Sequence, residues 1–248
     1  MRKFFVKSED ICGNNIKIIG TDVNHIKNVL RLKEGEKIQI ANQDTSENYI
    51  CEILELNRDF INTKIIENIE GVSEGNVELH IFQGLPKADK MELIIQKGTE
   101  LGVSKFIPVA FKRSIVKLSG KDEIKKIERW QKIAEVAAKQ SQRDLIPEVK
   151  NVLTVKNICN LVQQYDIMLL AYEEEMDNYI KNELINIKNT KENLKIAVVI
   201  GPEGGIEKEE VELLKQAGAK VVSLGKRILR TETVALQVSS IIMYELEK

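Results

Sequence analysis

The first seventy residues alternate between short apolar segments and polar breaks. Five segments have the length and the β-branched or aromatic content of strands: KFFV, IKIIG, EKIQIA, NYICEILEL and FINTKIIENI. Between them, one stretch has helical spacing. It begins near Thr21 or Asp22, either of which can serve as N-cap, and it places Ile26, Val29 and Leu30 on one face. We therefore predict a small barrel-like β domain with one helix.

A different pattern follows the aperiodic stretch GVSEGN at residues 71–76, which we expect to be a linker. Strand-like segments now alternate with helical ones. The predicted strands are VELHIFQG, FIPVAF, DIMLLAY, KIAVVIG and VVSLG. The predicted helices cover residues 89–101, a long segment around 124–138, the segment after Gly205, and about 231–246. This alternation predicts an α/β fold with a mainly parallel sheet covered on both faces, and domains at residues 1–72 and 73–248.

Composition excludes several classes of protein. The chain has 248 residues, of which 43% are hydrophobic and 30% charged, as in an ordinary globular protein. Its apolar runs are too short to span a bilayer, and its N-terminus lacks a signal-peptide core, so we expect a cytoplasmic protein without a membrane partner. Three scattered cysteines without CxxC spacing and two distant histidines predict no disulfide framework and no metal. The chain has no GxSxG elbow of a serine hydrolase.

The charge is balanced in total but not along the chain. The formal net charge is −1, from 37 basic and 38 acidic residues. Residues 84–150 carry 15 basic and 9 acidic side chains, whereas every other segment is slightly acidic. A localised excess of this kind is typical of a surface that binds a polyanion. A solvated, lysine-rich helix face would give the same count.

Candidate chemistry lies where three predicted strands end, in LLAYEEE, VVIGPEGG and VSLGKRILRTET. In a parallel sheet, ligands bind beyond the carboxyl ends of the strands. The glycine-rich loop Gly201–Gly205 lacks both a Walker sequence and GxGxxG, so it does not predict a phosphate cradle. Pro202 removes an N–H donor and Glu203 would repel a phosphate. A neutral or cationic ligand suits this loop better, and a purely structural turn is the alternative.

The third strand end carries more polar groups than a turn requires. Its cations alternate with apolar residues before a threonine that is a plausible N-cap and a glutamate in the first helical turn. These residues are Lys226, Arg227, Ile228, Leu229, Arg230, Thr231 and Glu232. An arginine that snorkels from a core helix would explain one of the cations, but not the set.

Taken together, IGPEGG and LGKRILRTET are similar to the paired C-terminal signature of the RsmE-type rRNA methyltransferases of the SPOUT superfamily. Three further segments, at residues 25–38, 87–109 and 129–147, resemble other blocks of that family in the same order. The resemblance covers nearly the whole chain. Two positions depart from the pattern: Lys90 stands where an arginine is expected, and Val234 where an alanine is expected.

This resemblance implies a SPOUT domain at residues 73–248 with a C-terminal trefoil knot, and a PUA-like RNA-binding β-barrel domain at residues 1–72. It implies S-adenosyl-L-methionine (SAM) as cofactor and a homodimer. The implied substrate is 16S rRNA of the small ribosomal subunit, methylated at N3 of a uridine.

The resemblance also assigns residues. The implied cofactor contacts are Leu170, Ala171, Gly201, Pro202, Glu203, Gly204, Gly205, Leu224, Gly225, Ile228, Leu229 and Thr233. For catalysis, Arg230 or Arg227 would stabilise the uracil anion, and Glu232 would either orient an arginine or take the proton. The candidate RNA contacts are Arg2, His25, Arg31, Lys87, Lys90, Arg113, Lys117 and Arg143. For His25 and Arg31, a structural role is the alternative.

Three other functions remain as alternatives. A SPOUT enzyme for another RNA, such as tRNA, is disfavoured by the agreement of the N-terminal segment. A non-catalytic RNA-binding or ribosome-assembly factor is disfavoured by the intact IGPEGG and RTET loops. A Rossmann-type oxidoreductase is disfavoured by the missing GxGxxG.

Overall fold

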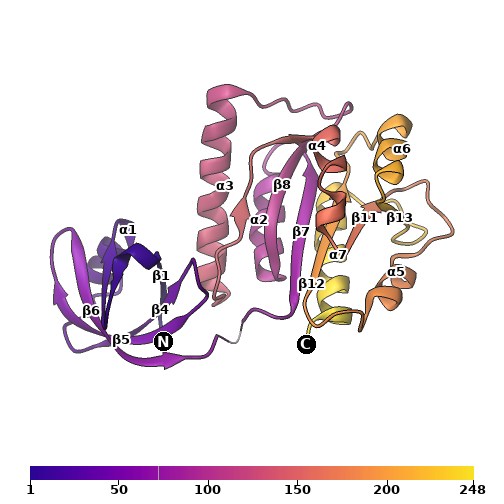
Figure 1. Cartoon of the computed structure of the whole chain (residues 1–248). Coiled ribbons are helices and arrows are strands. Elements are labelled where there is room, and N and C mark those ends of the chain that lie inside the picture. The colour runs from indigo at the N-terminus through magenta and orange to yellow at the C-terminus, as the bar shows by residue number, and fades with distance from the viewer. Residues whose placement is uncertain (72) are drawn as a thin grey trace. The chain divides into compact units, whose positions relative to one another are not determined.

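The computed structural model of the chain describes residues 1–71 and 73–248 (Figure 1). Its contacts divide the chain into two compact units. The first unit comprises residues 1–74 and 138–146, and the second comprises residues 75–137 and 147–248. Val72, part of the linker expected at residues 71–76, lies outside the described residues. The first unit is therefore built from two separate stretches of chain.

The described residues of the first unit form a six-stranded sheet in the order β1-β4-β5-β6-β3-β2. The strands are β1 (Lys3–Val6), β2 (Ile11–Cys12), β3 (Asn15–Ile19), β4 (Lys37–Asn42), β5 (Asn48–Leu56) and β6 (Phe60–Ile69). β1 and β4 are parallel, and the other neighbours are antiparallel. Alternate residues of the strands enclose an apolar core that includes Ile16, Ile18, Ile38, Ile40, Cys51 and Ile53. Five of these six strands are those that the sequence predicts.

The predicted helix of this unit is short and irregular. A 3-10 turn, η1 (Ser8–Asp10), precedes α1 (Thr21–Asn24), which continues as a π-helical turn, η2 (His25–Val29). Ile26 is fully buried against the sheet. The prediction of Thr21 or Asp22 as N-cap is wrong: the N-cap is Gly20, whose φ of 74° is accessible to glycine without strain.

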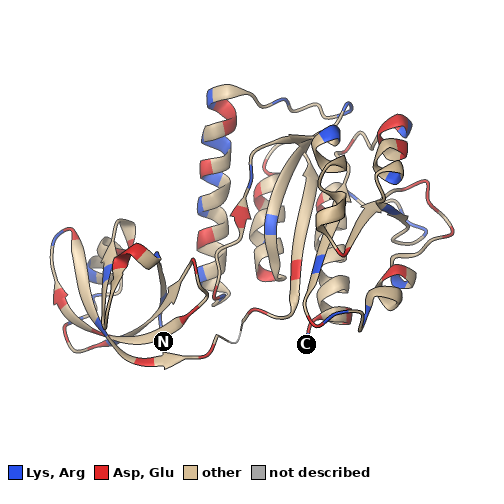
Figure 2. Cartoon of the chain, in the orientation of Figure 1, with Lys and Arg blue, Asp and Glu red and all other residues tan. Residues whose placement is uncertain are grey.

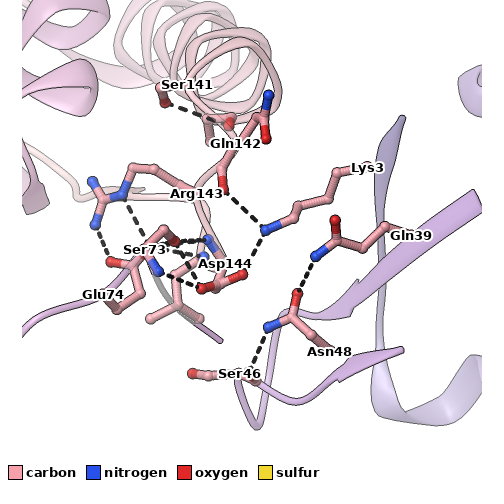
Figure 3. Close-up of polar contacts among 12 residues, drawn as sticks. Lys3, Gln39, Ser46, Asn48, Ser73, Glu74, Ser141, Gln142, Arg143 and Asp144 are labelled. Atoms are coloured by element: carbon pink, nitrogen blue, oxygen red, sulfur yellow. Dashed lines mark hydrogen bonds and ion pairs between the residues drawn. The ribbon is translucent and has the colours of Figure 1, made fainter. Parts of the chain in front are cut away.

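A cluster of charged side chains attaches residues 138–146 to the rest of the first unit (Figure 3). Nζ of Lys3 lies 2.5 Å from Oδ1 of Asp144, and both side chains are nearly inaccessible to solvent. Arg143 donates from Nε and Nη2 to the carboxylate of Glu74 at 3.1 and 2.5 Å. Ser73 donates its N–H and its hydroxyl to Asp144. These bonds satisfy charges that burial would otherwise penalise.

The second unit contains a parallel sheet in the order β10-β8-β7-β12-β11-β13, with β9 paired to β8. The strands are β7 (Val77–Gly84), β8 (Val103–Ala110), β9 (Glu148–Val149), β10 (Leu153–Thr154), β11 (Ile167–Ala171), β12 (Leu194–Ile200) and β13 (Lys220–Val222). The helices are α2 (Lys90–Glu100), α3 (Gly120–Gln140, which runs on into the first unit), α4 (Val155–Cys159), η3 (Val162–Gln164), α5 (Ile180–Ile187), α6 (Lys208–Gln216) and α7 (Thr231–Leu246).

Helices cover both faces of this sheet, as predicted (Figure 1). On one face, Phe82, Leu170 and Val199 pack against residues of α4 and α6. On the other face, α7 contacts β7 and β12, and α2 packs against α7 and β8. The middle strands are therefore buried on both sides, which explains why the sequence of β12, LKIAVVI, is almost continuously apolar.

No helix within residues 1–71 and 73–248 has both the length and the hydropathy needed to cross a bilayer. In the same described residues, histidine, cysteine, aspartate and glutamate side chains do not gather in threes that could hold a metal ion.

Candidate active site

A cavity of about 570 Å³ lies at the carboxyl ends of β11, β12 and β13. Its walls come from the segment after β11, the Gly201–Gly205 loop after β12, the segment after β13, and the first turns of α2 and α7. These walls include the three strand ends at which the sequence places the chemistry. Parallel strands bring their carboxyl ends to one edge, so residues as far apart in the sequence as Lys90 and Val234 meet there.

The Gly201–Gly205 loop is a tight turn packed closely against neighbouring backbone. The N–H of Gly205 donates to the carbonyl of Pro202 at 2.9 Å, and Gly205 has a φ of 72°. A Cβ on Gly84, at the end of β7, would lie 2.5 Å from the main-chain nitrogen of Pro202. Glycine at position 84 therefore lets the loop reach the strand next to it.

Buried hydrogen bonds fix the start of α7 to this loop. The hydroxyl of Thr231 donates to the carbonyl of Gly201 at 2.6 Å and accepts from Nε2 of Gln83 at 2.8 Å. The N-cap of α7 is Arg230, so the prediction of Thr231 as N-cap is wrong. Thr231 is the first helical residue, and its hydroxyl bonds to the neighbouring loop instead of capping its own helix.

Three cations of the segment after β13 line the cavity without a carboxylate partner. Lys226, Arg227 and Arg230 are exposed, and no ion pair to them occurs among the described residues. Ile228, between them, is 88% exposed. The other two arginines of this unit do have such partners: Arg113 is paired with Glu207 and Arg129 with Glu92. The unpaired cations make this side of the cavity suitable for an anionic substrate.

A salt-bridged cluster lies at the start of α2. Nζ of Lys90 lies 3.0 Å from Oε1 of Glu203 and 3.1 Å from Oε2 of Glu232. The carboxylates of Glu203 and then Glu232, next to its ammonium, raise the pKa of Lys90, which is therefore a cation at neutral pH. Burial opposes ionisation of Glu203, but the ammonium of Lys90 and the N–H of Lys87 outweigh it and lower the pKa of this carboxyl group.

Comparison with known proteins identifies the architecture that carries this site. Residues 73–243 match the family model of an RNA methyltransferase domain, and residues 18–66 match that of an RNA methyltransferase PUA domain. Ribosomal RNA small subunit methyltransferase E of Bacillus subtilis is 38% identical to the chain, over 100% of the chain and 98% of its own length. The chain belongs to the ribosomal RNA small subunit methyltransferase E family.

Two solved structures resemble the fold of this chain along almost its whole length. A ribosomal RNA small subunit methyltransferase E from Neisseria gonorrhoeae, bound to SAM, is 25% identical with a TM-score of 0.86, and the match covers 100% of this chain and 98% of that one. A putative methyltransferase from Legionella pneumophila, in complex with SAM, is 25% identical with a TM-score of 0.83, over 99% and 98%. The N-terminal domain of this methyltransferase E family protein is thus PUA-like, and its larger domain contains the parallel sheet.

Most of the residues predicted to contact the cofactor of this methyltransferase line the cavity. They are Ala171, Gly201, Pro202, Glu203, Gly205, Leu224, Gly225, Ile228 and Leu229. Three others do not line it. Leu170 is fully buried in the core, Gly204 packs against the main chain of Arg113, and Thr233 is exposed on the first turn of α7.

The cavity is also lined by residues that were not among the predicted contacts: Tyr172, Glu173, Met176, Ile200 and Ser223. Val234, one of the two departures from the family pattern, lines it too. Tyr172 ends the predicted strand DIMLLAY, and Glu173 and Met176 follow it, so their position at a strand end is the signal that could have found them. Of the predicted catalytic residues, Arg227 and Arg230 line the cavity, whereas Glu232 contacts Lys90 behind it.

The eight predicted RNA contacts fall into two groups. Lys90, Arg113 and Arg143 have carboxylate partners, in Glu203 and Glu232, Glu207, and Glu74 respectively. Among the described residues, no carboxylate pairs with the side chains of the other five, which are exposed: Arg2, His25, Arg31, Lys87 and Lys117. Along α3, in the basic segment, Lys and Arg are interspersed with Asp and Glu in the sequence (Figure 2).

Proposed function

We propose that the chain is a SAM-dependent methyltransferase that modifies N3 of a uridine in 16S rRNA of the small ribosomal subunit. The observation that carries this proposal is the cavity at the strand ends, with unpaired cations on one wall, in a chain that aligns over its full length with a small-subunit rRNA methyltransferase. Two relatives of the same fold were solved with SAM bound.

The residues of the cavity fit this cofactor. Its walls combine apolar side chains with glycines that leave main-chain donors and acceptors accessible, which suits the edge of an adenine. A Cβ on Gly225 would contact nothing within 4 Å, so this glycine, with a φ of 117°, leaves open space for a ligand. We assign cofactor contacts to the nine predicted residues that line the cavity; Leu170, Gly204 and Thr233 do not line it.

When bound, SAM supplies a methyl group on a sulfonium sulfur. The protein has to align the uracil with that carbon, and alignment of two reactants lowers the barrier by roughly 7–11 kcal/mol. Uracil N3 also has to lose its proton. If N3 titrates about two pH units above neutrality, ionisation costs roughly 3 kcal/mol at pH 7. Arg230 or Arg227 offsets this cost by contacting the developing negative charge on O2 or O4. Glu232 either orients an arginine or takes the proton.

The RNA crosses the basic surface of the second unit and the PUA-like unit. We assign phosphate contacts to the five unpaired cations Arg2, His25, Arg31, Lys87 and Lys117, and an additional contact to Arg113. Such contacts make affinity fall as the salt concentration rises. Lys90 and Arg143 contribute to the RNA surface only if the RNA displaces the carboxylates that they hold.

The resemblance to the SPOUT superfamily supports three further assignments. We place a trefoil knot in the C-terminal segment of residues 73–248; the contact of Thr231 with Gly201 and Gln83, far apart in sequence, is consistent with it. We also infer a homodimer and a cytoplasmic enzyme, since assembly of the small ribosomal subunit takes place there.

Transfer of labelled methyl groups tests the proposed function. Purified protein, SAM and small subunits from cells that lack the enzyme should yield 16S rRNA with one N3-methyluridine, located by mass spectrometry. Arg230→Lys and Glu232→Gln should lower the rate at saturating SAM, whereas Arg129→Lys, on the exposed side of α3, serves as a control. SAM binding without transfer to any RNA would refute the enzyme in favour of a binding factor, and transfer to tRNA would refute the substrate.

A further inference from the structure

Lys90 connects three segments that frame the cavity. It is the first residue of α2, Glu203 belongs to the loop after β12, and Glu232 is in the first turn of α7. Oε1 of Glu203 also accepts the N–H of Lys87 at 3.0 Å, which joins the glycine-rich loop to the turn before α2. In that turn, Ala88 has a φ of 52°, a conformation that a non-glycine residue adopts only when its surroundings hold it.

The carboxylate of Glu232 depends on Lys90 for its charge balance. The side chain of Glu232 is 14% exposed, and its Oε2 atom is buried and accepts no hydrogen bond of good geometry from the described residues. The ammonium of Lys90, 3.1 Å away, is the cation that faces this oxygen. Burying a charged carboxylate is costly unless a cation of this kind pairs with it. The N-terminal end of α7 adds a smaller favourable contribution.

Without Lys90, two carboxylates would face each other. Both lie within about 3 Å of the same ammonium, so the two oxygen atoms are at most about 6 Å apart. The other charged groups that line the cavity are Glu173, Lys226, Arg227 and Arg230. These are exposed and belong to the segments after β11 and β13, whereas the Lys90 cluster is held at the start of α2.

We propose that Lys90 is a positioning residue of the active site, which fixes the Glu232 carboxylate and the Gly201–Gly205 loop by bridging Glu203 and Glu232, and that it does not contact RNA phosphate. This inference rests on the proposed function, because it assigns Lys90 a role in methyl transfer. It replaces the expectation that this lysine belongs to the RNA surface. A lysine is suited to the bridge, since its compact ammonium contacts two carboxylates from different directions.

The test compares Lys90→Met, Lys90→Arg, Glu232→Gln and the double variant Lys90→Met/Glu232→Gln in single-turnover methyl transfer. Lys90→Met should lower the rate about a hundredfold, the loss expected when a reacting group is misplaced by about 1 Å. The double variant should react no more slowly than the slower of the two single variants, because both substitutions remove the same ion pair between Lys90 and Glu232. Lys90→Arg keeps the charge and should recover most of the rate. Lys97→Met, on the same helix, should react at the wild-type rate, since the carboxylate that pairs with Lys97 among the described residues is Glu100, away from the cavity lining.

Two further measurements separate positioning from a merely structural role and from RNA binding. In Lys90→Met, loss of the ammonium that lowers the pKa of Glu203 should move the acidic limb of the pH–rate profile to higher pH. The salt dependence of RNA affinity should stay at the wild-type slope. A wild-type rate in Lys90→Met, multiplicative effects in the double variant, or a salt slope reduced by about one would each overturn the proposal.

The wild-type protein in the same assay reports separately on the proposed function. If it transferred no methyl group, that function would be refuted, and the bridge would be judged from melting temperatures alone. The loss of stability on Lys90→Met should then be smaller in the Glu232→Gln background than in wild type, because only the pair with Glu203 is left to lose; an equal loss in both backgrounds would mean that Lys90 does not act through Glu232.

Discussion

His80 should make the stability of the second unit depend on pH between neutrality and pH 4. Its side chain is 2% exposed; Nε2 lies 2.7 Å from Oε1 of Glu78, and Nδ1 lies 2.8 Å from the hydroxyl of Tyr165. Because a carboxylate only accepts hydrogen bonds, Nε2 carries the proton and donates to Glu78, and Tyr165 donates to Nδ1. Burial lowers the pKa of His80 from 6.5 to about 4, and Glu78 opposes this change only in part.

The direction of this pH dependence follows from the number of protons that the folded and the unfolded chain bind. Above pH 6.5, the ring is neutral in both the folded and the unfolded chain. As the pH falls from 6.5 to about 4, the unfolded chain binds a proton that the folded chain does not, so the free energy of unfolding decreases. A lowered pKa of this size corresponds to a loss of about 3 kcal/mol at the acidic end of that range.

Urea unfolding of wild type, His80→Gln and His25→Gln at several pH values from 7 to 4 measures this contribution. Glutamine keeps a donor and an acceptor but does not titrate. His25 is the matched control, because it is exposed and belongs to the first unit. The slope of unfolding free energy against pH should be smaller in His80→Gln than in wild type, and unchanged in His25→Gln. Equal slopes in all three proteins would refute the burial argument.

Other substitutions test the packing around the two sites. Arg143→Met should destabilise the first unit by about 2–3 kcal/mol, less than for a fully buried pair because Glu74 is 23% exposed; unchanged urea unfolding with a smaller salt slope for RNA binding would favour a phosphate contact instead. Gly84→Ala places a Cβ 2.5 Å from the main chain of Pro202, which should cost about 1–3 kcal/mol and weaken SAM binding in calorimetry. Thr231→Val removes a buried donor and should cost about 1–3 kcal/mol, whereas Thr231→Ser should restore most of that stability.

The apolar pattern was a reliable guide where elements are long. β5, β6, β12 and α7 agree with the apolar patterns that predict them. The sequence analysis missed α5, which has eight residues, and several shorter elements: β9 and β10 have two residues each, and α4 has five. Elements of this length owe their existence to tertiary contacts, because so few residues carry no period. The N-cap of the first helix was wrong for a related reason, since Gly20 uses its backbone freedom where a side-chain cap was expected.

In the site, too, the sequence predicted what depends on local pattern but not what depends on tertiary contacts. Position at strand ends predicted Gly201, Arg227 and Arg230 near a common cavity, because parallel strands deliver their ends to one edge. The sequence could not show that Lys90 faces Glu203 and Glu232, since these residues meet only after folding. A count of charges likewise treats every lysine as free, whereas the fold decides which cations already have a partner.

The two-part construction of the first unit has a consequence for its synthesis. Residues 1–74 leave the ribosome while residues 138–146 are still untranslated, so Phe5 and Ala41 lack Ala138 against which they pack, and Lys3 lacks Asp144. At about 5–20 residues per second, translating the intervening stretch takes roughly 3–15 s. During that interval the nascent N-terminal sheet has an apolar surface that is not yet covered and a lysine without its carboxylate partner. The first unit can therefore complete its folding only late in synthesis, after α3 has been translated.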